Sequence, residues 1–533
     1  MAFLTIKRNF AFLFIIFLSL TQCLISQENL VNDDWPAFRQ NAQRSSSSKI
    51  VLSDNLKLSW ARKFPALVPA WLDDASEAGL LFDVSYHPIV VDKTLFLASS
   101  GNDCLYAIST ESGDILWKYY AEAPIRFAPV ASKEKIYFVS DDSHLYCLNI
   151  KTGELVWKFR GAPNDSRVIA NSRISSMWVA RGGPAIDGQK VFFAAGIWPF
   201  MGTFVYAIDK DSGKCIWSNT GSGAIYRTQG HQSPAFAGLA PQGYLSVGKE
   251  IILVPNGRSH PAGLNKETGK TLFIPNKSGG IVAPITEKLF FFAGNANWNE
   301  NSNPSGDLRG PYVFNEEYIY SGSFQANDLK NITIQEPVTS GGKTKPVLPL
   351  KLLWNEKVKT DIQFISGNRL YGTADKTIHC YDLPETNKSI TVPTLVKTWV
   401  IPEGKITELL AADQKLWAVT LEGHLYCFAD EKLVKNEVIT KTEEIKPLPA
   451  NSSNLVDPLY EICKTKEGYA VVLGIGTGAM IEQFVGSSKF NIVVVESDSK
   501  LVEKFRKKWD ENGLYGNRIV IITDDPLNCE RPP

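Results

Sequence analysis

Bulky and small residues alternate along much of this chain, and one alternating pattern recurs. Residues 105–117 hold a strand, a break at Ser112–Gly113 and a second strand that ends in tryptophan. The same pattern fills residues 145–157 and 205–217, with tyrosine, glycine and tryptophan at identical spacing. Glycine suits the break because a tight hairpin often requires a positive φ. Three copies at one internal spacing indicate a repeat protein.

A pair of apolar strands precedes each copy, at residues 88–98, 128–139 and 183–194. With the tyrosine and tryptophan strands they give units of four short antiparallel strands at intervals of roughly 40–50 residues, which is typical of β-propeller blades. Weaker copies continue to residue 428. The pattern predicts an all-β propeller of about eight four-stranded blades. Seven is the alternative, because residues 280–350 do not divide clearly.

Two incomplete units suggest how the ring closes. The last unit, at residues 416–428, lacks a tryptophan strand, whereas residues 56–62 form such a strand without opening strands before it. A strand donated to the last blade would remove two open sheet edges. We therefore expect Trp60 to lie beside Leu425–Phe428. The tryptophans that recur with the repeat should be largely buried between neighbouring blades: Trp117, Trp157 and Trp217.

The amino terminus reads as a secretory signal peptide over residues 1–26. Two basic residues precede an apolar run at residues 10–20, and no acidic residue occurs before Glu28. The run is too short to span a membrane comfortably, and no later run is longer, so no transmembrane span is expected. Gln22 stands where a lipidation signal has a small residue, which argues against a lipid anchor at Cys23. The protein is expected to be exported, to the periplasm or cell envelope.

Charge balance and cysteine positions indicate which classes of partner and ligand the chain is not expected to bind. Lys+Arg and Asp+Glu number 56 each in 533 residues, so no bulk field attracts nucleic acid and no nucleic-acid partner is predicted. Cys147, Cys380 and Cys427 occupy one register of three repeats, where other copies have alanine. They are read as small buried residues rather than as disulfides or metal ligands, and no metal site is predicted.

The repeat motif resembles that of pyrroloquinoline-quinone-type propellers. Residues 34–45 are similar to the lead-in of exported bacterial propellers of that group, which are often described as similar to the outer-membrane-protein assembly propeller. This resemblance covers roughly residues 34–430 and implies a fold, and a protein or peptide partner on the propeller surface. Quinone dehydrogenases of the superfamily typically carry adjacent cysteines at the cofactor. The chain has no Cys-Cys pair, which argues against pyrroloquinoline quinone.

The amino-acid composition changes after the repeats. Residues 431–454 are rich in Lys, Glu, Thr, Pro and Ser and read as a linker. Residues 455–533 follow as an incomplete α/β, Rossmann-like segment in the order βαβαβ. Its first strand runs into three alternating glycines, the second ends in Glu496, and the third ends in two acidic residues, Asp524 and Asp525. Glycines allow close backbone approach to a ligand, and an acidic residue can bind ribose hydroxyls.

This segment resembles the first half of a class I S-adenosylmethionine-dependent methyltransferase. The resemblance implies that Gly474, Gly476 and Gly478 face the methionine part, Glu496 the ribose, and Asp524 or Asp525 the adenine. A dinucleotide site competes, but its third glycine would fall at Ala479. A glycine turn without any ligand is the other alternative.

Three hypotheses follow from the sequence. The first is an exported propeller that serves as a binding or assembly scaffold with an S-adenosylmethionine-binding-like segment appended. The second is an S-adenosylmethionine-dependent methyltransferase, truncated here, whose propeller positions a substrate. The third and weakest is a quinone-dependent dehydrogenase. The segment has three strands, whereas a complete domain of the methyltransferase class has roughly seven. Export would also place the protein in a compartment where S-adenosylmethionine is not expected. No catalytic residue is therefore assigned.

Overall fold

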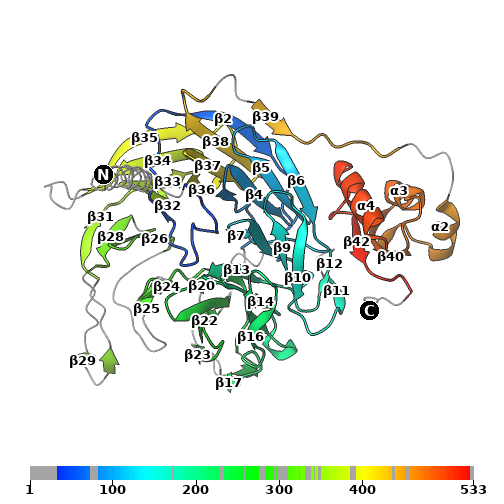
Figure 1. Ribbon diagram of the computed structural model, residues 1–533, viewed down its shortest axis with the longest axis horizontal. Helices are drawn as coiled ribbons and strands as arrows, with labels where there is room; N and C mark the ends of the chain where they lie inside the picture. The colour runs from blue at the N-terminus through cyan, green and yellow to red at the C-terminus, as the bar shows by residue number, and fades with distance from the viewer. Residues whose placement is uncertain are drawn as a thin grey trace, which may run out of the picture.

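The computed structural model describes residues 33–71, 82–170, 173–228, 233–236, 238–256, 259–274, 282–287, 289–292, 295–297, 310–322, 324–330, 338–340, 343–345, 350–384, 392–434, 439–449 and 455–527. The expected signal peptide and Cys23 lie outside these residues. Seven four-stranded antiparallel sheets form a β-propeller, and a small α/β segment lies beside the ring (Figure 1).

Six of the seven blades add their four strands in chain order, and the last takes its fourth strand, β2, from the start of the propeller sequence; the first strand of each blade lies nearest the centre of the ring (Figure 1). The first four blades are β3–β6 (Ile89–Val91, Thr94–Ser99, Cys104–Ser109, Ile115–Tyr120), β7–β10 (Val130–Ser132, Lys135–Val139, His144–Asn149, Leu155–Arg160), β13–β16 (Gly182–Asp187, Lys190–Ala195, Phe204–Asp209, Cys215–Asn219) and β20–β23 (Ser246–Val247, Ile251–Asn256, Ser259–Asn265, Thr271–Phe273). The remaining three are β26, β27, β28 and β31 (Tyr312–Phe314, Tyr318–Ser321, Gln325–Asp328, Leu352–Asn355), β32–β35 (Asp361–Ser366, Arg369–Ala374, Thr377–Asp382, Thr394–Val400), and β36, β37, β38 and β2 (Ile406–Ala412, Lys415–Thr420, His424–Asp430, Leu56–Lys63).

Short strands outside the blades decorate the ring. β1 (Ser47–Ser48) adds to β32, and β19 (Gly243–Tyr244) adds to β13. Four hairpins stand between blades or within their loops: β11 and β12 (Arg167–Ala170, Arg173–Ser176), β17 and β18 (Tyr226–Thr228, Pro234–Phe236), β24 and β25 (Phe290–Phe292, Asn295–Asn297), and β29 and β30 (Val338–Ser340, Lys343–Lys345). The 3₁₀-helix η2 spans Pro199–Met201.

The ring closes as the sequence predicts. β2 pairs antiparallel with β38, and Trp60 lies opposite Cys427. The last blade is therefore built from both ends of the propeller sequence. Inside residues 431–454, which the sequence assigned to a linker, β39 (Ile439–Thr442) adds a fifth, parallel strand to β2. The outer edge of this blade is thus covered, which the composition of these residues did not indicate.

Seven is the lower of the two blade numbers that the sequence left open. The additional predicted unit falls between the blades of β20–β23 and β26–β31. Among the described residues of this unit, the structure shows the hairpin β24–β25 and a bridge between Ile285 and Phe290. A hairpin of this size is not a four-stranded blade.

The repeat tryptophans hold successive blades together. Each indole lies against the turn glycine of the next blade, where an added Cβ would stand 2.4–2.8 Å from the ring: Trp60 on Gly113, Trp117 on Gly153, Trp157 on Gly213 and Trp217 on Gly269. These glycines have φ near +70°. Trp117 Nε1 also donates to Ile150 O of the next blade at 3.2 Å.

The four repeat indoles differ in how far they are buried. Trp60 is buried, but Trp117, Trp157 and Trp217 are of intermediate exposure. They do lie between blades, as expected. They stand on outer strands, where one side of the ring meets solvent, whereas the additional strand β39 covers Trp60.

The small residues of the third strands face these indoles across the sheet. Ala107 pairs with Trp117, Cys147 with Trp157 and Ala207 with Trp217. Cys147, Cys380 and Cys427 are buried and unpaired, which confirms that they act as small core residues. A large side chain here would meet the indole of its own blade.

Residues 33–48, which we name the belt, run around the ring. Main-chain hydrogen bonds of 2.7–3.1 Å join the belt to residues of six blades and to Ile285, namely Asp413, Val90, Ala131, Val247, Ile285, Phe314 and Ile365. The remaining blade is reached by Arg44, whose guanidinium donates to Pro184 O at 2.9 Å. Arg44 is fully buried. The belt thus ties all seven blades to one continuous strand of chain.

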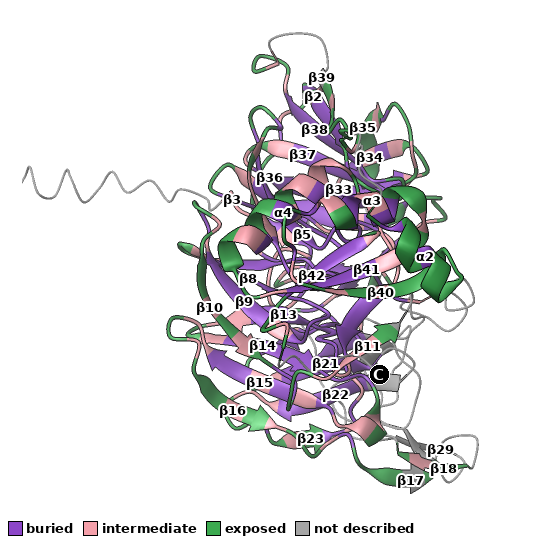
Figure 2. Ribbon diagram, turned by 90° about the vertical axis from the view of Figure 1, so that its right-hand side faces the viewer, coloured by how far each residue is buried: buried purple, intermediate pink, exposed green. Residues whose placement is uncertain are grey.

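The α/β segment consists of α2 (Asp457–Cys463), β40 (Glu467–Leu473), α3 (Ala479–Ser487), β41 (Lys489–Glu496), α4 (Ser499–Glu511) and β42 (Ile519–Thr523). Its parallel sheet has the order β40-β41-β42. β41 and β42 are mostly buried, whereas β40 is mostly exposed (Figure 2). α3 and α4 pack on one face, through Phe484, Phe505 and Trp509. On the other face, Val493 and Ile522 contact Ile174 of the propeller.

Candidate functional site

The three glycines form the loop between β40 and α3, as the sequence predicts. Gly474, Gly476 and Gly478 have φ of +84°, +57° and +79°. A Cβ on Gly478 would collide with Phe505, so this glycine is required for packing. Gly474 and Gly476 have nothing within 4 Å of the position that a Cβ would take. Two of the three glycines therefore border open space rather than packed protein.

Glu496 ends β41 and lies beside this loop. Its carboxylate accepts hydrogen bonds from Ile475 N and Asp498 N, both at 2.9 Å. The bonds from Asp498 N and Ile475 N hold the pKa of Glu496 below its ordinary value. The residue is half-buried and ionised near neutral pH, and it fixes the glycine loop against the neighbouring strand.

The two acidic residues after β42 lie at the same edge of the sheet. Asp524 N donates to Glu496 O at 3.2 Å, and Asp525 N donates to the Asp524 carboxylate at 2.8 Å. Both residues are exposed. All six residues predicted from the sequence therefore follow one edge, the carboxyl ends of three parallel strands, where open α/β sheets bind ligands.

The propeller contacts this segment through a docking interface centred on Asp510 of α4. Its buried carboxylate accepts hydrogen bonds from Lys118, Tyr120 and Asn102 of the first blade, at 2.8, 2.8 and 2.7 Å. Nearby, Tyr515 OH donates to Ala121 O at 2.8 Å. A buried carboxylate with three partners anchors α4 to the ring.

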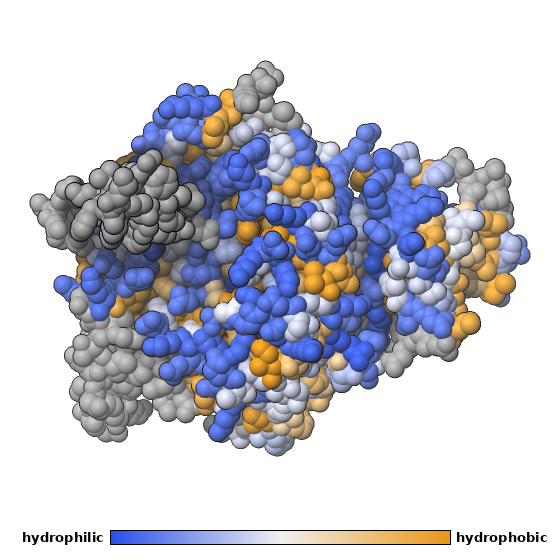
Figure 3. Space-filling model, in the orientation of Figure 1, coloured by the Kyte–Doolittle hydropathy of each residue, from blue (hydrophilic) through white to orange (hydrophobic). Residues whose placement is uncertain are grey.

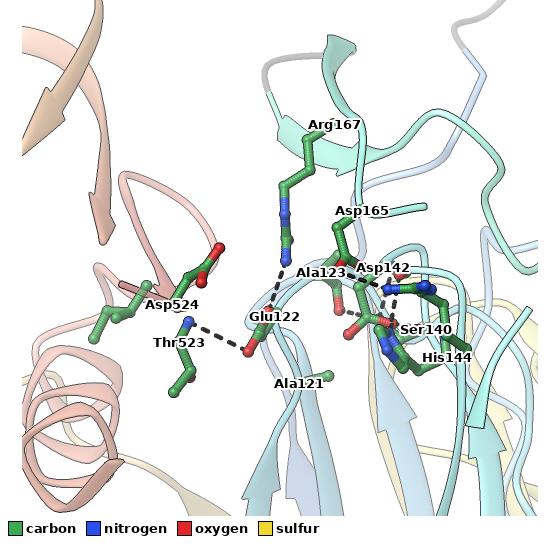
Figure 4. Close-up of polar contacts among 12 residues, drawn as sticks. Ala121, Glu122, Ala123, Ser140, Asp142, His144, Asp165, Arg167, Thr523 and Asp524 are labelled. Atoms are coloured by element: carbon green, nitrogen blue, oxygen red, sulfur yellow. Dashed lines mark hydrogen bonds and ion pairs between the residues drawn. The ribbon is translucent and has the colours of Figure 1, made fainter. Parts of the chain in front are cut away.

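A second carboxylate crosses the interface in the opposite direction (Figure 4). Glu122, in the loop after β6, accepts from Thr523 N at 3.3 Å and pairs with Arg167 at 2.9 Å. Arg506 of α4 lies 3.8 Å away. Burial alone would raise the pKa of Glu122, but the charges of Arg167 and Arg506 hold it below its ordinary value. Asp524 and Arg167 lie on either side of this glutamate in Figure 4.

The loops behind Glu122 are held by hydrogen bonds of their own. Ser140 donates to Ala123 O at 2.9 Å, and the buried Asp142 accepts from the main chain of His144 at 2.9 Å (Figure 4). Burial opposes ionisation of Asp142, but its interactions with His144 hold its pKa below the ordinary range. The propeller wall beside Asp524 is therefore rigid and charged.

Sequence reasoning did not find Glu122 or Arg167. Neither belongs to a repeat motif: Glu122 lies in the loop after β6, and Arg167 begins β11, in a hairpin between two blades. The hydrogen bond of Glu122 with Thr523 joins residues 401 positions apart. No local pattern reports such a contact.

A second surface carries aromatic side chains on long loops of the propeller. Trp71 and Trp198 meet edge to face at 6.1 Å, and Trp198 lies 6.2 Å from Phe200. Tyr226 and Phe236 pair at 5.3 Å in the hairpin β17–β18. Trp198, Phe200, Tyr226 and Phe236 are 44–64% exposed. We name these residues with Trp71 the aromatic rim.

A third cluster, of ionisable groups, is buried between the belt and two blades. His87 Nδ1 lies 3.2 Å from a Glu408 carboxylate oxygen. Burial raises the pKa of Glu408 to about 8 against the charge of Arg39, and burial lowers the pKa of His87 to about 4. Arg39, from the belt, donates to Ser46 at 2.8 Å. Near neutral pH burial thus favours the uncharged forms of both Glu408 and His87, beside the belt residue Arg39.

The described part of the chain contains no group of three or more metal-ligating side chains. Nor does any helix within it have the length and apolar character needed to cross a membrane. The described cysteines include no adjacent pair.

Comparison with known proteins identifies the repeat type. Residues 60–220 match the family described as outer membrane protein assembly factor BamB. That match ends before the α/β segment and does not test its resemblance to methyltransferases. No curated protein matches the chain.

Several solved structures are similar in fold at low identity. The quinohemoprotein alcohol dehydrogenase of Comamonas testosteroni is 13% identical, with 80% of this chain and 84% of that chain covered, at a TM-score of 0.48. A europium-containing methanol dehydrogenase is 12% identical, with 75% of this chain and 98% of that chain covered, at a TM-score of 0.46. BamB from Moraxella catarrhalis is 12% identical, with 70% of this chain and 98% of that chain covered, at a TM-score of 0.33. Similarity at this level identifies neither a ligand nor an activity for this chain.

Proposed function

We propose that this protein is an exported binding and assembly scaffold, located in the periplasm or cell envelope, whose propeller binds a protein or peptide through the aromatic rim. The observation that carries the proposal is the exposure of Trp198, Phe200, Tyr226 and Phe236 on loops of one ring. Large aromatic side chains are enriched at protein interfaces and dominate their energetics. The balanced charge of the chain favours such a partner over nucleic acid.

The α/β segment extends this scaffold as a docked part. Asp510 and Glu122 bind across the docking interface in opposite directions, so that each side supplies a carboxylate to the other. An independent enzyme domain on a flexible tether would not need buried charges of this kind. We therefore assign the segment a structural place in the scaffold, whether or not it also binds a ligand.

A site-specific photo-crosslinker tests the scaffold. Placed at Phe200 or Tyr226 in cells that produce the protein naturally, it should give discrete protein adducts. The control position is Val51, which is 70% exposed and lies outside the rim. Trp198→Asp should abolish the adducts while the melting temperature is retained. Equal adducts at Val51, or none at Phe200 and Tyr226, would show that the rim is not a binding surface.

The alternative function is that of an S-adenosylmethionine-dependent methyltransferase whose propeller positions the substrate. The observation in its favour is the open space beside Gly474 and Gly476, next to the ionised Glu496. The residues fit a nucleoside ligand: the glycine loop would receive its methionine part, Glu496 its ribose, and Asp524 or Asp525 its adenine. When bound, this cofactor supplies an activated methyl group. The chain would bind and orient it.

Calorimetry separates this alternative from the scaffold. If the edge is a cofactor site, S-adenosylmethionine binds to the whole chain, and Glu496→Gln weakens binding at least tenfold. Glu503→Gln, an exposed glutamate on α4, is the matched control and should bind like the natural chain. Absence of heat with the natural chain contradicts cofactor binding by this chain and leaves the rim crosslinks to decide the scaffold.

The third hypothesis, a quinone-dependent dehydrogenase, gains no residue from the structure. The described cysteines of the repeats lie in different blades: Cys104, Cys147, Cys380 and Cys427 are buried, and Cys215 is exposed. We therefore do not propose pyrroloquinoline quinone as a cofactor.

A further inference from the structure

Among the described residues, the sheet of the α/β segment has an edge, at β40, where no further strand pairs. β40 pairs with β41 on one side only. Its sequence between Glu467 and Leu473 contains no charged residue, and apolar side chains stand on both faces. Such a pattern is typical of a strand inside a parallel sheet, where both faces are buried. Here the strand stands at the edge.

Apolar side chains are exposed on both sides of this edge. On one face, Tyr469, Val471 and Leu473 are 40–46% exposed. On the other side, Leu459 and Ile462 of α2 are 41% and 78% exposed. Figure 3 shows apolar residues gathered at this outer end of the molecule. An edge strand with such neighbours is a template for pairing with another strand.

The outer strands of the blades differ from β40 in the features that protect an edge. β35 carries Lys397 among its exposed residues, and β10 carries Lys158 and Arg160. β2 is covered by β39. Charged residues and added strands are the usual protection against edge pairing. β40 has neither between Glu467 and Leu473 among the described residues.

The charges at the two ends of β40 indicate the occupant. Three exposed lysines stand at the amino end of the strand and of its neighbour, Lys464, Lys466 and Lys489, beside Glu467. The carboxyl end carries carboxylates instead: Glu496, Asp498, Asp524 and Asp525. A two-fold axis places the same surface on both partners, and antiparallel pairing then sets the amino end of one strand against the carboxyl end of the other. The lysine-bearing end of one sheet would then lie toward the end of the other sheet that carries Glu496 and Asp498, after the strand next to β40.

We propose that β40 pairs with β40 of a second copy of this chain. The two three-stranded sheets then form one continuous sheet across the two-fold axis. Tyr469 and Val471 of both copies come together on one face, and Leu459 and Ile462 of both copies meet on the other. This pairing uses the opposite edge of the sheet from β42, whose end contacts the propeller, so the docking interface and the aromatic rim stay free.

Mass measurement by light scattering and sedimentation tests the pairing. The purified chain should reach about twice its 59.1 kDa mass at micromolar concentration. Tyr469→Lys with Val471→Lys should raise the dimer dissociation constant at least tenfold, because charge on an edge opposes pairing. The control carries two lysines elsewhere, Val51→Lys with Leu527→Lys, at positions 70% and 83% exposed. The control should dimerise normally.

Hydrogen exchange gives a readout that does not depend on a variant. The amides of residues 467–473 should exchange more slowly as the concentration of the natural chain rises, whereas those of α4 should not change. A monomer at all concentrations would overturn the proposal. A dimer that the β40 lysines leave intact, or exchange at β40 that is independent of concentration, would also overturn it.

Discussion

The propeller and the α/β segment bury their strands in different ways. In the propeller, each sheet is covered by neighbouring blades, and the belt adds hydrogen bonds along the inner strands. In the segment, α3 and α4 cover one face, while the other face relies on Ile174 of the propeller and leaves β40 open. The ring is therefore complete within the described residues, whereas the segment depends on its surroundings. The stability of the segment should therefore respond more to changes in neighbouring surfaces than the stability of the ring does.

Glycines illustrate the same difference. Gly153 and Gly476 both adopt positive φ, at +72° and +57°. The first is packed beneath the indole of Trp117, and the second faces open space. The repeat glycine is thus explained by packing. The loop glycine is explained by its backbone conformation alone. A glycine with open space beside it is also what a ligand site requires, because the ligand can then approach the backbone closely.

The largest expected effect comes from breaking the closure of the ring. Trp60 is 3% exposed, and its indole donates to Thr110 O of the first blade at 3.1 Å. Replacing a buried tryptophan by alanine costs about 3–5 kcal/mol. Trp60→Ala should lower the free energy of unfolding by this amount in a denaturant titration.

The half-buried Trp157 provides the comparison for Trp60. Trp157→Ala should cost less than Trp60→Ala, about 1–3 kcal/mol, because part of its ring is already in solvent. Equal losses at the two positions would contradict the view that closure is the most sensitive contact of the ring.

The next effect tests whether the segment depends on the propeller. Asp510→Asn removes the charge that Lys118 pairs with and should weaken the docking interface by about 2–3 kcal/mol. Hydrogen exchange should then accelerate in α4 and β42 while the blades stay protected. Asp525→Asn, at an exposed position, is the control and should leave exchange unchanged. Unchanged exchange in Asp510→Asn would mean that the segment is stable by itself.

Sequence and structure agree where contacts are local. The turn glycines and the small residues opposite the indoles follow from one repeat, because the hairpin partners are close in the chain. Trp60 is the exception: its partner Cys427 is distant in the chain, and the pairing was predicted because two incomplete units complete each other. The glycine loop and Glu496 were likewise placed correctly, since a parallel βαβ unit brings them to one edge. The belt and Glu122 were not predictable. Their partners are distant in sequence, and no repeat or spacing records them.

A smaller effect concerns pH and belongs to the propeller alone. The raised pKa of Glu408, about 8, means that its contribution to stability is full below its ordinary pKa and is lost as pH rises through 8. The lowered pKa of His87, about 4, acts oppositely: its contribution is full above its ordinary pKa and is lost as pH falls towards 4. The contribution of the two groups to the free energy of unfolding should therefore be greatest between the ordinary pKa of Glu408, 4.5, and that of His87, 6.5.

Glu408→Gln isolates the alkaline limb. The variant should lack the loss between pH 6.5 and 8.5, and gain on the order of 1–2 kcal/mol relative to the natural chain over that interval. Denaturant titrations at several pH values measure this difference. Glu403→Gln is the control, because its carboxylate beside His424 is 66% exposed. A pH profile that Glu408→Gln leaves unchanged would show that this carboxyl is ionised at no cost.

The smallest effect compares one glycine from each region. Gly188, in the turn between β13 and β14, and Gly476 share φ of +57°, and neither has an atom within 4 Å of an added Cβ. Alanine at either position should cost about 1 kcal/mol through backbone strain alone. The two variants should therefore melt at nearly the same temperature. If the glycine edge binds S-adenosylmethionine, calorimetry will show weaker binding for Gly476→Ala, since the methyl group fills the open side of the loop, and unchanged binding for Gly188→Ala. If both variants bind as the natural chain does, the loop glycine serves its turn and nothing else.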